Sequence, residues 1–309
     1  MKGLELARKY YEDCFKDILF TDFKDIAGKT AVGLCGSGSE CFGFDDELST
    51  DHDFEPGFCI FIPGEDIVDR RTAFLLQRAY DKLPKEFMGF KRSLVSPVGG
   101  SRHGVIRLDD FVYEKLGGFP LTMEQWLRIP SYALAEAING EVWYDGYGQL
   151  TGIREYVTDM PEDVRLKRLA GQLMVMAQSG QYNFERCLKH GERAAAGLAI
   201  AEFVKASLEV IFLLNHSYVP YYKWGFRALK TRLFLSEMYE PLQYLIAGDP
   251  FDDNGKMFDI GEVCRAVQGE LRAQGITSMD CDDMEKHAYS VNDHIKDGNI
   301  RSLNIFCTV

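Results

Sequence analysis

Residues 30–54 read TAVGLCGSGSECFGFDDELSTDHDF, and this stretch decides the fold that the sequence predicts. Residues 30–35 are short, apolar and bounded by glycine, which is the pattern of a buried strand that runs into a turn. We call the four residues that follow, Gly36-Ser37-Gly38-Ser39, the glycine-serine turn. A second strand is expected at residues 58–62, where Pro63 and Gly64 end the apolar run.

The glycine-serine turn predicts a binding site for an anion. Glycine lets a ligand approach the backbone closely, and a strand that ends in such a turn leaves N–H groups and hydroxyls facing the ligand. We therefore assign Gly36, Ser37, Gly38 and Ser39 to the β- and γ-phosphates of a bound nucleotide. The turn is not a Walker loop, because no Gly-Lys-Ser or Gly-Lys-Thr follows it.

Two carboxylates, Asp51 and Asp53, follow the turn. Side chains one residue apart in an extended strand point to the same face, so both carboxylates can reach one site. Mg²⁺ binds oxygen and commonly takes one or two carboxylates together with substrate phosphates. We expect Asp51 and Asp53 to be catalytic residues that ligate Mg²⁺, or Mn²⁺ in its place.

The order of these elements resembles a known superfamily. A strand, a Gly-Ser turn, an intervening stretch and Ser-Asp-x-Asp on the next strand form the signature of the polymerase-β-like nucleotidyltransferases, which include the aminoglycoside and lincosamide nucleotidyltransferases. Gly38-Ser39 followed by residues 49–53 resembles that layout with one residue inserted. More closely, residues 36–40, 43–49, 51–53 and 218–224 resemble the DUF4037 family of bacterial proteins.

The resemblance implies a metal-dependent nucleotidyltransferase that transfers a nucleoside monophosphate from NTP to an acceptor hydroxyl or phosphate and releases pyrophosphate. ATP is the expected co-substrate and AMP the expected transferred group, although no motif identifies the base. Superfamily members usually carry a third acidic residue on a neighbouring strand. Residues 103–110 form the candidate strand here, and its apolar middle has no carboxylate. Asp109 would take this position if the strand extends that far; otherwise the third carboxylate is missing or comes from elsewhere.

Lys223 is a candidate nucleotide ligand in the second half of the chain. It follows two tyrosines and precedes Trp224 at a predicted helix start, where a cation could meet triphosphate oxygens in a cleft. The same run is equally typical of an amphipathic hinge whose aromatic side chains pack in the core.

The apolar periodicity predicts an α+β fold of two domains. Intervals of three and four residues predict an opening helix over residues 4–19. A further strand is expected at residues 105–108, and a last short strand or a surface turn at residues 142–146. Helical windows follow at residues 162–178, 184–214, 223–245, 260–273 and 282–296. We therefore expect a nucleotidyltransferase-like mixed sheet with helices in residues 1–158, followed by an all-helical bundle in residues 159–309.

The net charge and the composition restrict the classes of partner that the protein is expected to bind. A net charge of −12 argues against a basic face for DNA or long RNA, so the expected acceptor is a small molecule rather than a protein or an RNA end. Residues 1–19 lack the apolar run of a signal peptide, and no segment has the roughly 20 apolar residues of a membrane helix. The eight cysteines show no zinc spacing. The sequence thus predicts a cytoplasmic protein with no membrane partner.

Two other functions fit the sequence. Without a third carboxylate, the same fold would be a non-catalytic nucleotide sensor. Alternatively, the helical half would carry a protein partner, as in a toxin and antitoxin pair. The acidic residues Asp45, Asp46 and Glu47 are interpreted as a solvated loop outside the site.

Overall fold

The structure is a computed structural model that describes residues 1–47, 55–92 and 102–309. Packing divides the chain into two compact units. The first unit contains Met1–Pro120 and Ala133–Asp159, and the second contains Leu121–Tyr132 and Met160–Val309. The division into domains at residues 158 and 159 stays a prediction, and the structure adds that a short segment before it packs with the second unit.

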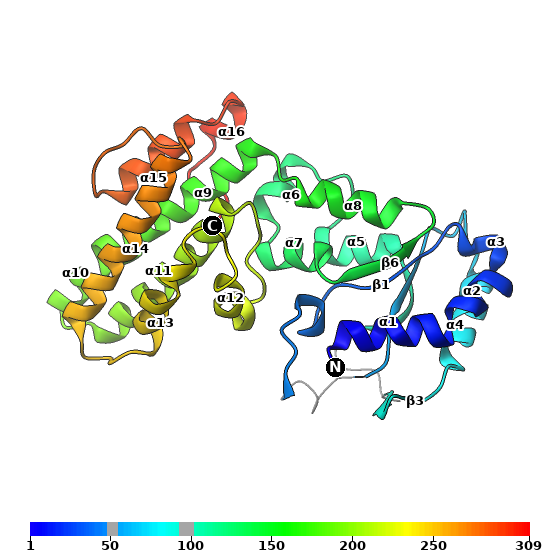
Figure 1. The fold of residues 1–309 in the computed structure, drawn as a ribbon. Coiled ribbons are helices and arrows are strands. Elements are labelled where there is room, and N and C mark those ends of the chain that lie inside the picture. Colours follow the sequence, from blue (N-terminus) through cyan, green and yellow to red (C-terminus); the bar gives the residue numbers. More distant parts are fainter. Residues whose placement is uncertain (48–54, 93–101) are drawn as a thin grey trace. The chain divides into compact units, whose positions relative to one another are not determined.

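A four-stranded mixed sheet, in the order β5-β2-β1-β6, is the framework of the first unit (Figure 1). β1 (Ala31–Leu34) pairs antiparallel with β2 (Cys59–Ile62) and with β6 (Glu141–Asp145), and β2 pairs in parallel with β5 (Gly104–Arg107). β1 and β2 are buried along their whole length, which explains why both are continuous apolar runs in the sequence. The predicted α+β class and the four predicted strands are confirmed.

Aromatic side chains join the surrounding helices to the start of β2. α1 (Gly3–Cys14), α2 (Lys16–Thr21) and α3 (Lys24–Ala27) precede β1, and α4 (Arg70–Asp81) follows β2. The ring centroid of the fully buried Phe58 lies 5.8 Å from that of Tyr10 and 5.1 Å from that of Tyr80. Because edge contacts between aromatic rings add to the gain from apolar burial, they fix α1 and α4 against the sheet.

The opening helix predicted over residues 4–19 is two helices in the structure. The break falls at Phe15, whose backbone angles (φ −129°, ψ −27°) depart from helical values. The buried ring of Phe15 packs 5.5 Å from that of Phe58. Tertiary packing therefore overrides the local pattern at this residue.

Shorter elements complete the first unit. α5 (Leu108–Leu116) follows β5 directly, and α7 (Ser131–Ile138) and α8 (Gln149–Thr158) lie on either side of β6 in the sequence. A 3-10 turn, η1 (Glu40–Phe42), follows the glycine-serine turn, and β3 (Glu86–Phe87) and β4 (Phe90–Lys91) form a small hairpin.

The second unit is helical, as predicted. α9 (Glu162–Met176) packs against α11 (Arg193–Leu214) and α15 (Met284–Asp293). The helix predicted over residues 184–214 is interrupted near Gly191, whose positive φ of 73° ends one helix before α11 begins. The other elements are α6 (Met123–Arg128), the π-helical η3 (Ala177–Phe184), α10 (Glu185–Lys189), α12 (Tyr222–Leu229), η4 (Ser236–Met238), α13 (Tyr239–Ala247), α14 (Asp253–Ala273) and α16 (Gly298–Ser302). Within the described part of the chain, no helix has both the length and the apolar character to cross a membrane.

A buried arginine attaches α6 to the second unit. Arg168 of α9 donates hydrogen bonds to the carbonyl oxygens of Trp126 (3.1 Å) and Ile129 (2.9 Å) and to Ser131 Oγ (3.0 Å). Ser131 in turn donates to Glu209 of α11 (2.6 Å). Burial lowers the pKa of Arg168 and raises that of Glu209, against the opposing effect of each charge on the other. The guanidinium thus satisfies carbonyls that the end of α6 leaves without helical partners.

Candidate functional site

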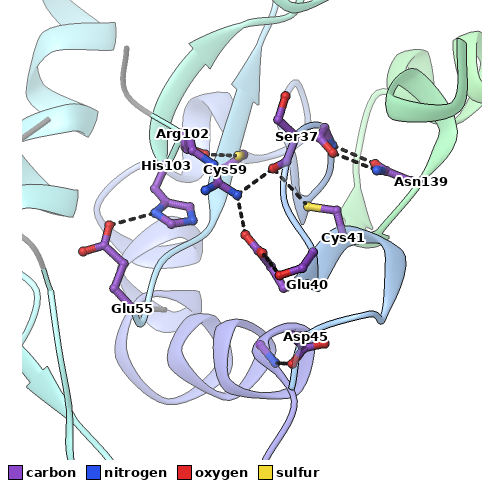
Figure 2. A network of polar contacts seen from close by, with 12 residues as sticks. Ser37, Glu40, Cys41, Asp45, Glu55, Cys59, Arg102, His103 and Asn139 are labelled. Carbon is purple, nitrogen blue, oxygen red and sulfur yellow. Dashed lines mark hydrogen bonds and ion pairs between the residues drawn. The ribbon is translucent and has the colours of Figure 1, made fainter. Parts of the chain in front are cut away.

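Asn139 holds the glycine-serine turn in place from across the sheet. The Gly36 N–H donates to Asn139 Oδ1 (2.8 Å), and Asn139 Nδ2 donates back to the Gly36 carbonyl (2.7 Å). Figure 2 shows this pair of bonds beside Ser37. Asn139 lies between α7 and β6, so the end of β1 is tied to the strand that pairs with it. The backbone of the turn is therefore fixed before any ligand binds.

Arg102 crosses the turn where a side chain at position 38 would lie. Its Nη2 donates to the Ser37 carbonyl (2.7 Å) and forms an ion pair with Glu40 Oε1 (2.6 Å), as Figure 2 shows. Gly38 has a positive φ of 130°, and a Cβ there would lie 2.0 Å from Arg102 Nη2. Only glycine permits both this conformation and this approach.

Ser37 lies between a cation and a carboxylate. Its hydroxyl donates to Glu136 Oε2 of α7 (2.9 Å) and accepts from Lys115 Nζ of α5 (3.1 Å). Lys115 and Glu136 also pair directly at 2.8 Å, and both side chains are largely buried. Burial acts to lower the pKa of Lys115, but hydrogen bonds to Glu136 and Glu114 outweigh it and raise the pKa.

The turn has backbone N–H groups that no described residue accepts from. Among the described residues, the N–H groups of Ser37, Gly38 and Ser39 have no hydrogen-bond acceptor. The neighbouring carboxylates of Glu40 and Glu136 are paired with Arg102 and Lys115, and Lys115 also pairs with Glu114 at 2.9 Å. Successive open N–H groups in a glycine-rich turn form a concavity suited to an anion.

Contacts of Arg102 and His103 join the segment before β5 to β2 and to the segment before β2. Cys59 Sγ donates to the Arg102 carbonyl (3.2 Å), and His103 Nδ1 lies 3.1 Å from Glu55 Oε1 (Figure 2). Gly57 is needed here, because a Cβ at this position would lie 2.5 Å from the His103 ring. Arg102 lies just before β5 and contacts Cys59 of β2, and this position places its guanidinium at the turn.

Asp45 is not a solvated residue, which corrects the prediction for this residue of the acidic run, whereas Asp46 and Glu47 are exposed. Its side chain is buried; Oδ2 accepts from the Gly3 N–H (2.8 Å) and Oδ1 lies 3.5 Å from Lys2 Nζ. A carboxylate at the first residue of a helix satisfies an N–H group that has no helical acceptor. Asp45 therefore fixes the start of α1 to the segment that follows η1.

Of the four remaining predicted site residues, the structure describes Asp109 and Lys223 but not Asp51 and Asp53. Asp51 and Asp53 lie outside the described residues. β5 ends at Arg107, and Asp109 is exposed in the first turn of α5 rather than on the strand. Lys223 is exposed on α12 in the second unit, with Nζ 5.1 Å from the centroid of the Trp224 ring system. The roles of all four residues stay predictions.

The sequence analysis missed four residues that contact the turn: Arg102, Lys115, Glu136 and Asn139. Three of them resemble ordinary charged surface residues in the sequence. The pair Asn139-Gly140 is a turn signal before a strand, and it could have indicated a sharp approach to β1.

The side chains around the turn favour an anion over a soft metal. Burial raises the pKa of Cys35 to about 11 and also raises that of Cys41 and Cys59, so these three thiols stay protonated near pH 7. In the described ranges no three His, Cys, Asp or Glu side chains are arranged to hold a metal ion. The oxygen donors of the predicted pair Asp51 and Asp53, by contrast, suit a hard cation such as Mg²⁺.

In comparison with known proteins, one family model matches part of the chain. Residues 126–225 match the model of a family described as a domain of unknown function (DUF4037). The match supports the predicted resemblance to that family, and it includes Glu136 and Asn139 but not the glycine-serine turn. No curated protein matches the chain.

Proposed function

We propose that this protein is a metal-dependent nucleotidyltransferase that transfers a nucleoside monophosphate, with ATP as the expected donor, to a small-molecule hydroxyl or phosphate. The observation that carries the proposal is the glycine-serine turn at the end of β1, where the N–H groups of Ser37, Gly38 and Ser39 have no acceptor within the part of the chain that the structure describes. Such a turn suits the β- and γ-phosphates of NTP.

The proposal assigns the following roles to residues of the chain. The N–H groups of Ser37, Gly38 and Ser39 and the Ser39 hydroxyl bind the terminal phosphates. Asp51 and Asp53 hold Mg²⁺, which when bound neutralises charge on the phosphates. The acceptor oxygen attacks the α-phosphorus, the bond from that phosphorus to the pyrophosphate oxygen breaks, and pyrophosphate leaves, while an acceptor hydroxyl loses its proton to solvent. Positioning and charge neutralisation supply most of the rate increase in such reactions.

The proposal also assigns roles to Asp109 and Lys223. Asp109 is the candidate for the third carboxylate, because it lies two residues beyond the last residue of β5. Lys223 is an exposed cation that could bind phosphate oxygens.

The position of Asp109 also favours a second candidate function. Since β5 itself carries no carboxylate, a protein that binds NTP without turnover would use the same turn. Measurement of pyrophosphate release distinguishes this sensor from the transferase.

The test is pyrophosphate release from each of the four NTPs with Mg²⁺, with and without an extract of small molecules. The variant Asp51→Asn/Asp53→Asn should lose release and metal-dependent NTP binding. The matched control, Asp17→Asn/Asp25→Asn, removes two exposed carboxylates on α2 and α3 and should keep both. Full NTP and metal binding by the Asp51/Asp53 variant would refute the proposed site, whereas binding by the parent without release would favour the sensor.

A further inference from the structure

A groove between α2 and α4 has the size and lining of a small-molecule site. It encloses about 710 Å³ and is lined on one side by Ile18 and Phe23 and on the other by Phe74 and Leu75, with Leu83 at its end. We call it the α2–α4 groove. Small-molecule sites in proteins typically have about 300–1,000 Å³ and a mostly apolar lining with few polar groups.

Two apolar side chains of α4 stay open to solvent along the groove. Phe74 is 59% exposed and Leu75 is 48% exposed. Leu76, the next residue of the helix, is buried in the core. The outward face of α4 is therefore apolar where a polar surface would be expected for a helix packed on one side.

Arg78 and Lys82 add positive charge to the same wall. They follow Phe74 at four-residue intervals, so the three side chains lie on one face of the helix. The guanidinium of Arg78 lies 5.9 Å from the Phe74 ring centroid. Within residues 1–47, 55–92 and 102–309, neither cation has an ion pair or a hydrogen bond to a side chain. Asp22 is the acidic residue of the lining, on the opposite wall.

The charge of this region differs in sign from that of the whole chain. Residues 69–92 contain seven Lys and Arg against three Asp and Glu, whereas the full chain has a net charge of −12. A local excess of cations at an apolar groove attracts anions that also have an apolar part.

We propose that the α2–α4 groove binds a small organic anion, made of an aromatic or aliphatic body and one phosphate or carboxylate group. The body packs on Phe74, Leu75 and Phe23, and the anion pairs with Arg78 and Lys82. The volume of the groove matches a small molecule, and the two cations at one wall match a single anionic group. This site is separate from the glycine-serine turn and does not depend on nucleotidyl transfer.

The test uses 1-naphthyl phosphate as the probe, with 1-naphthol and inorganic phosphate as partial probes, in calorimetric titrations of the full chain. Naphthyl phosphate should bind one site more tightly than either partial probe. Arg78→Gln/Lys82→Gln should weaken its affinity about 2-fold to 30-fold, the range for the loss of two exposed charge pairs. The matched control, Arg71→Gln/Lys85→Gln, removes two exposed cations outside the lining and should keep the affinity of the parent.

Alkylation of Cys14 tests whether the probe binds in the α2–α4 groove. Cys14 lines the groove and is partly exposed, so bound naphthyl phosphate should slow its reaction with iodoacetamide. Cys187, partly exposed on α10, should react at an unchanged rate.

Several outcomes would overturn the inference. Equal binding of naphthol and naphthyl phosphate would mean an apolar patch without an anion site. Binding that leaves Cys14 unprotected would place the anion elsewhere, for example at the glycine-serine turn. Binding of acidic phospholipid vesicles or of an acidic amphipathic peptide, without binding of naphthyl phosphate, would assign this face to a membrane or to a protein partner.

Discussion

The guanidinium of Arg102 occupies the space that a side chain at Gly38 would need, with Nη2 only 2.0 Å from the position of a Cβ. Residues 64 positions apart in the sequence thus form one unit, in which the cation supports the turn and the turn leaves room for the cation. The conformation of the turn depends on this pairing as much as on its own glycines.

Gly38→Ala should therefore disturb the turn more than an ordinary glycine substitution does. Strain at φ 130° and displacement of Arg102 should lower the free energy of unfolding by about 1–3 kcal/mol and weaken NTP binding. Urea unfolding and NTP titration measure the two effects. Gly43→Ala is the control, because Gly43 also has a positive φ (69°) but has open space around it. Equal losses in both variants would mean that the approach of Arg102 is unimportant.

Asn139→Ala should remove both hydrogen bonds that hold Gly36. We expect a stability loss of about 1–3 kcal/mol, since a buried backbone group loses its partner, together with weaker NTP binding. Asn215 provides a matched control, because it clamps the backbone of Phe234 through the same two kinds of bond (2.9 and 3.0 Å) in the second unit. Asn215→Ala should lose similar stability and keep its NTP affinity. Weak NTP binding in both variants would point to a general effect of destabilisation.

Lys115→Met should lower stability in a pH-dependent way. It leaves Glu136 without its cation, at a cost of about 1–3 kcal/mol near pH 7. The pKa of Lys115 is raised above 10.5 in the folded protein, so its stabilising effect is complete below that pH and disappears as the pH rises through the raised value. The stability difference between parent and variant should thus shrink only above about pH 10.5, as measured by urea unfolding at several pH values. Lys9→Met, at an exposed pair with Glu5, should change stability by less than about 1 kcal/mol. A difference that shrinks already between pH 7 and 9 would contradict this account.

Arg168→Met should be among the most harmful substitutions in the second unit. It leaves the partly buried Glu209 without the counter-charge of Arg168 and removes the hydrogen bonds of Arg168 to the carbonyls of Trp126 and Ile129, which should cost about 3–5 kcal/mol. Lys205→Met on α11, where the lysine side chain is 71% exposed, should change stability little. Thermal unfolding of both variants compares them. A small loss for Arg168→Met would show that α6 is held by apolar packing alone.

The sequence predicted the parts of the fold that depend on neighbouring residues. The strands of the sheet and the glycine-serine turn were found because apolar runs and glycines mark them directly. The break at Phe15 was not, because it depends on the distant ring of Phe58. In the site, the turn was predicted, but Arg102, Lys115 and Asn139 were not. They lie between 65 and 103 positions from the turn residues they contact, and only the folded sheet and helices bring them there.

The buried carboxylate of Asp45 makes one backbone amide a reporter for the segment beside the turn. Gly3 donates its N–H to Asp45 Oδ2, and Asp45 lies six residues after Ser39. Glycine amides are readily recognised in a nitrogen-15 correlation spectrum, and an amide proton bonded to a carboxylate resonates downfield. A nucleotide that moves residues 40–45 on binding would shift the Gly3 resonance without touching it. A binding event at the turn could in this way be followed through the amino-terminal helix, with no label on the nucleotide and no change to the site.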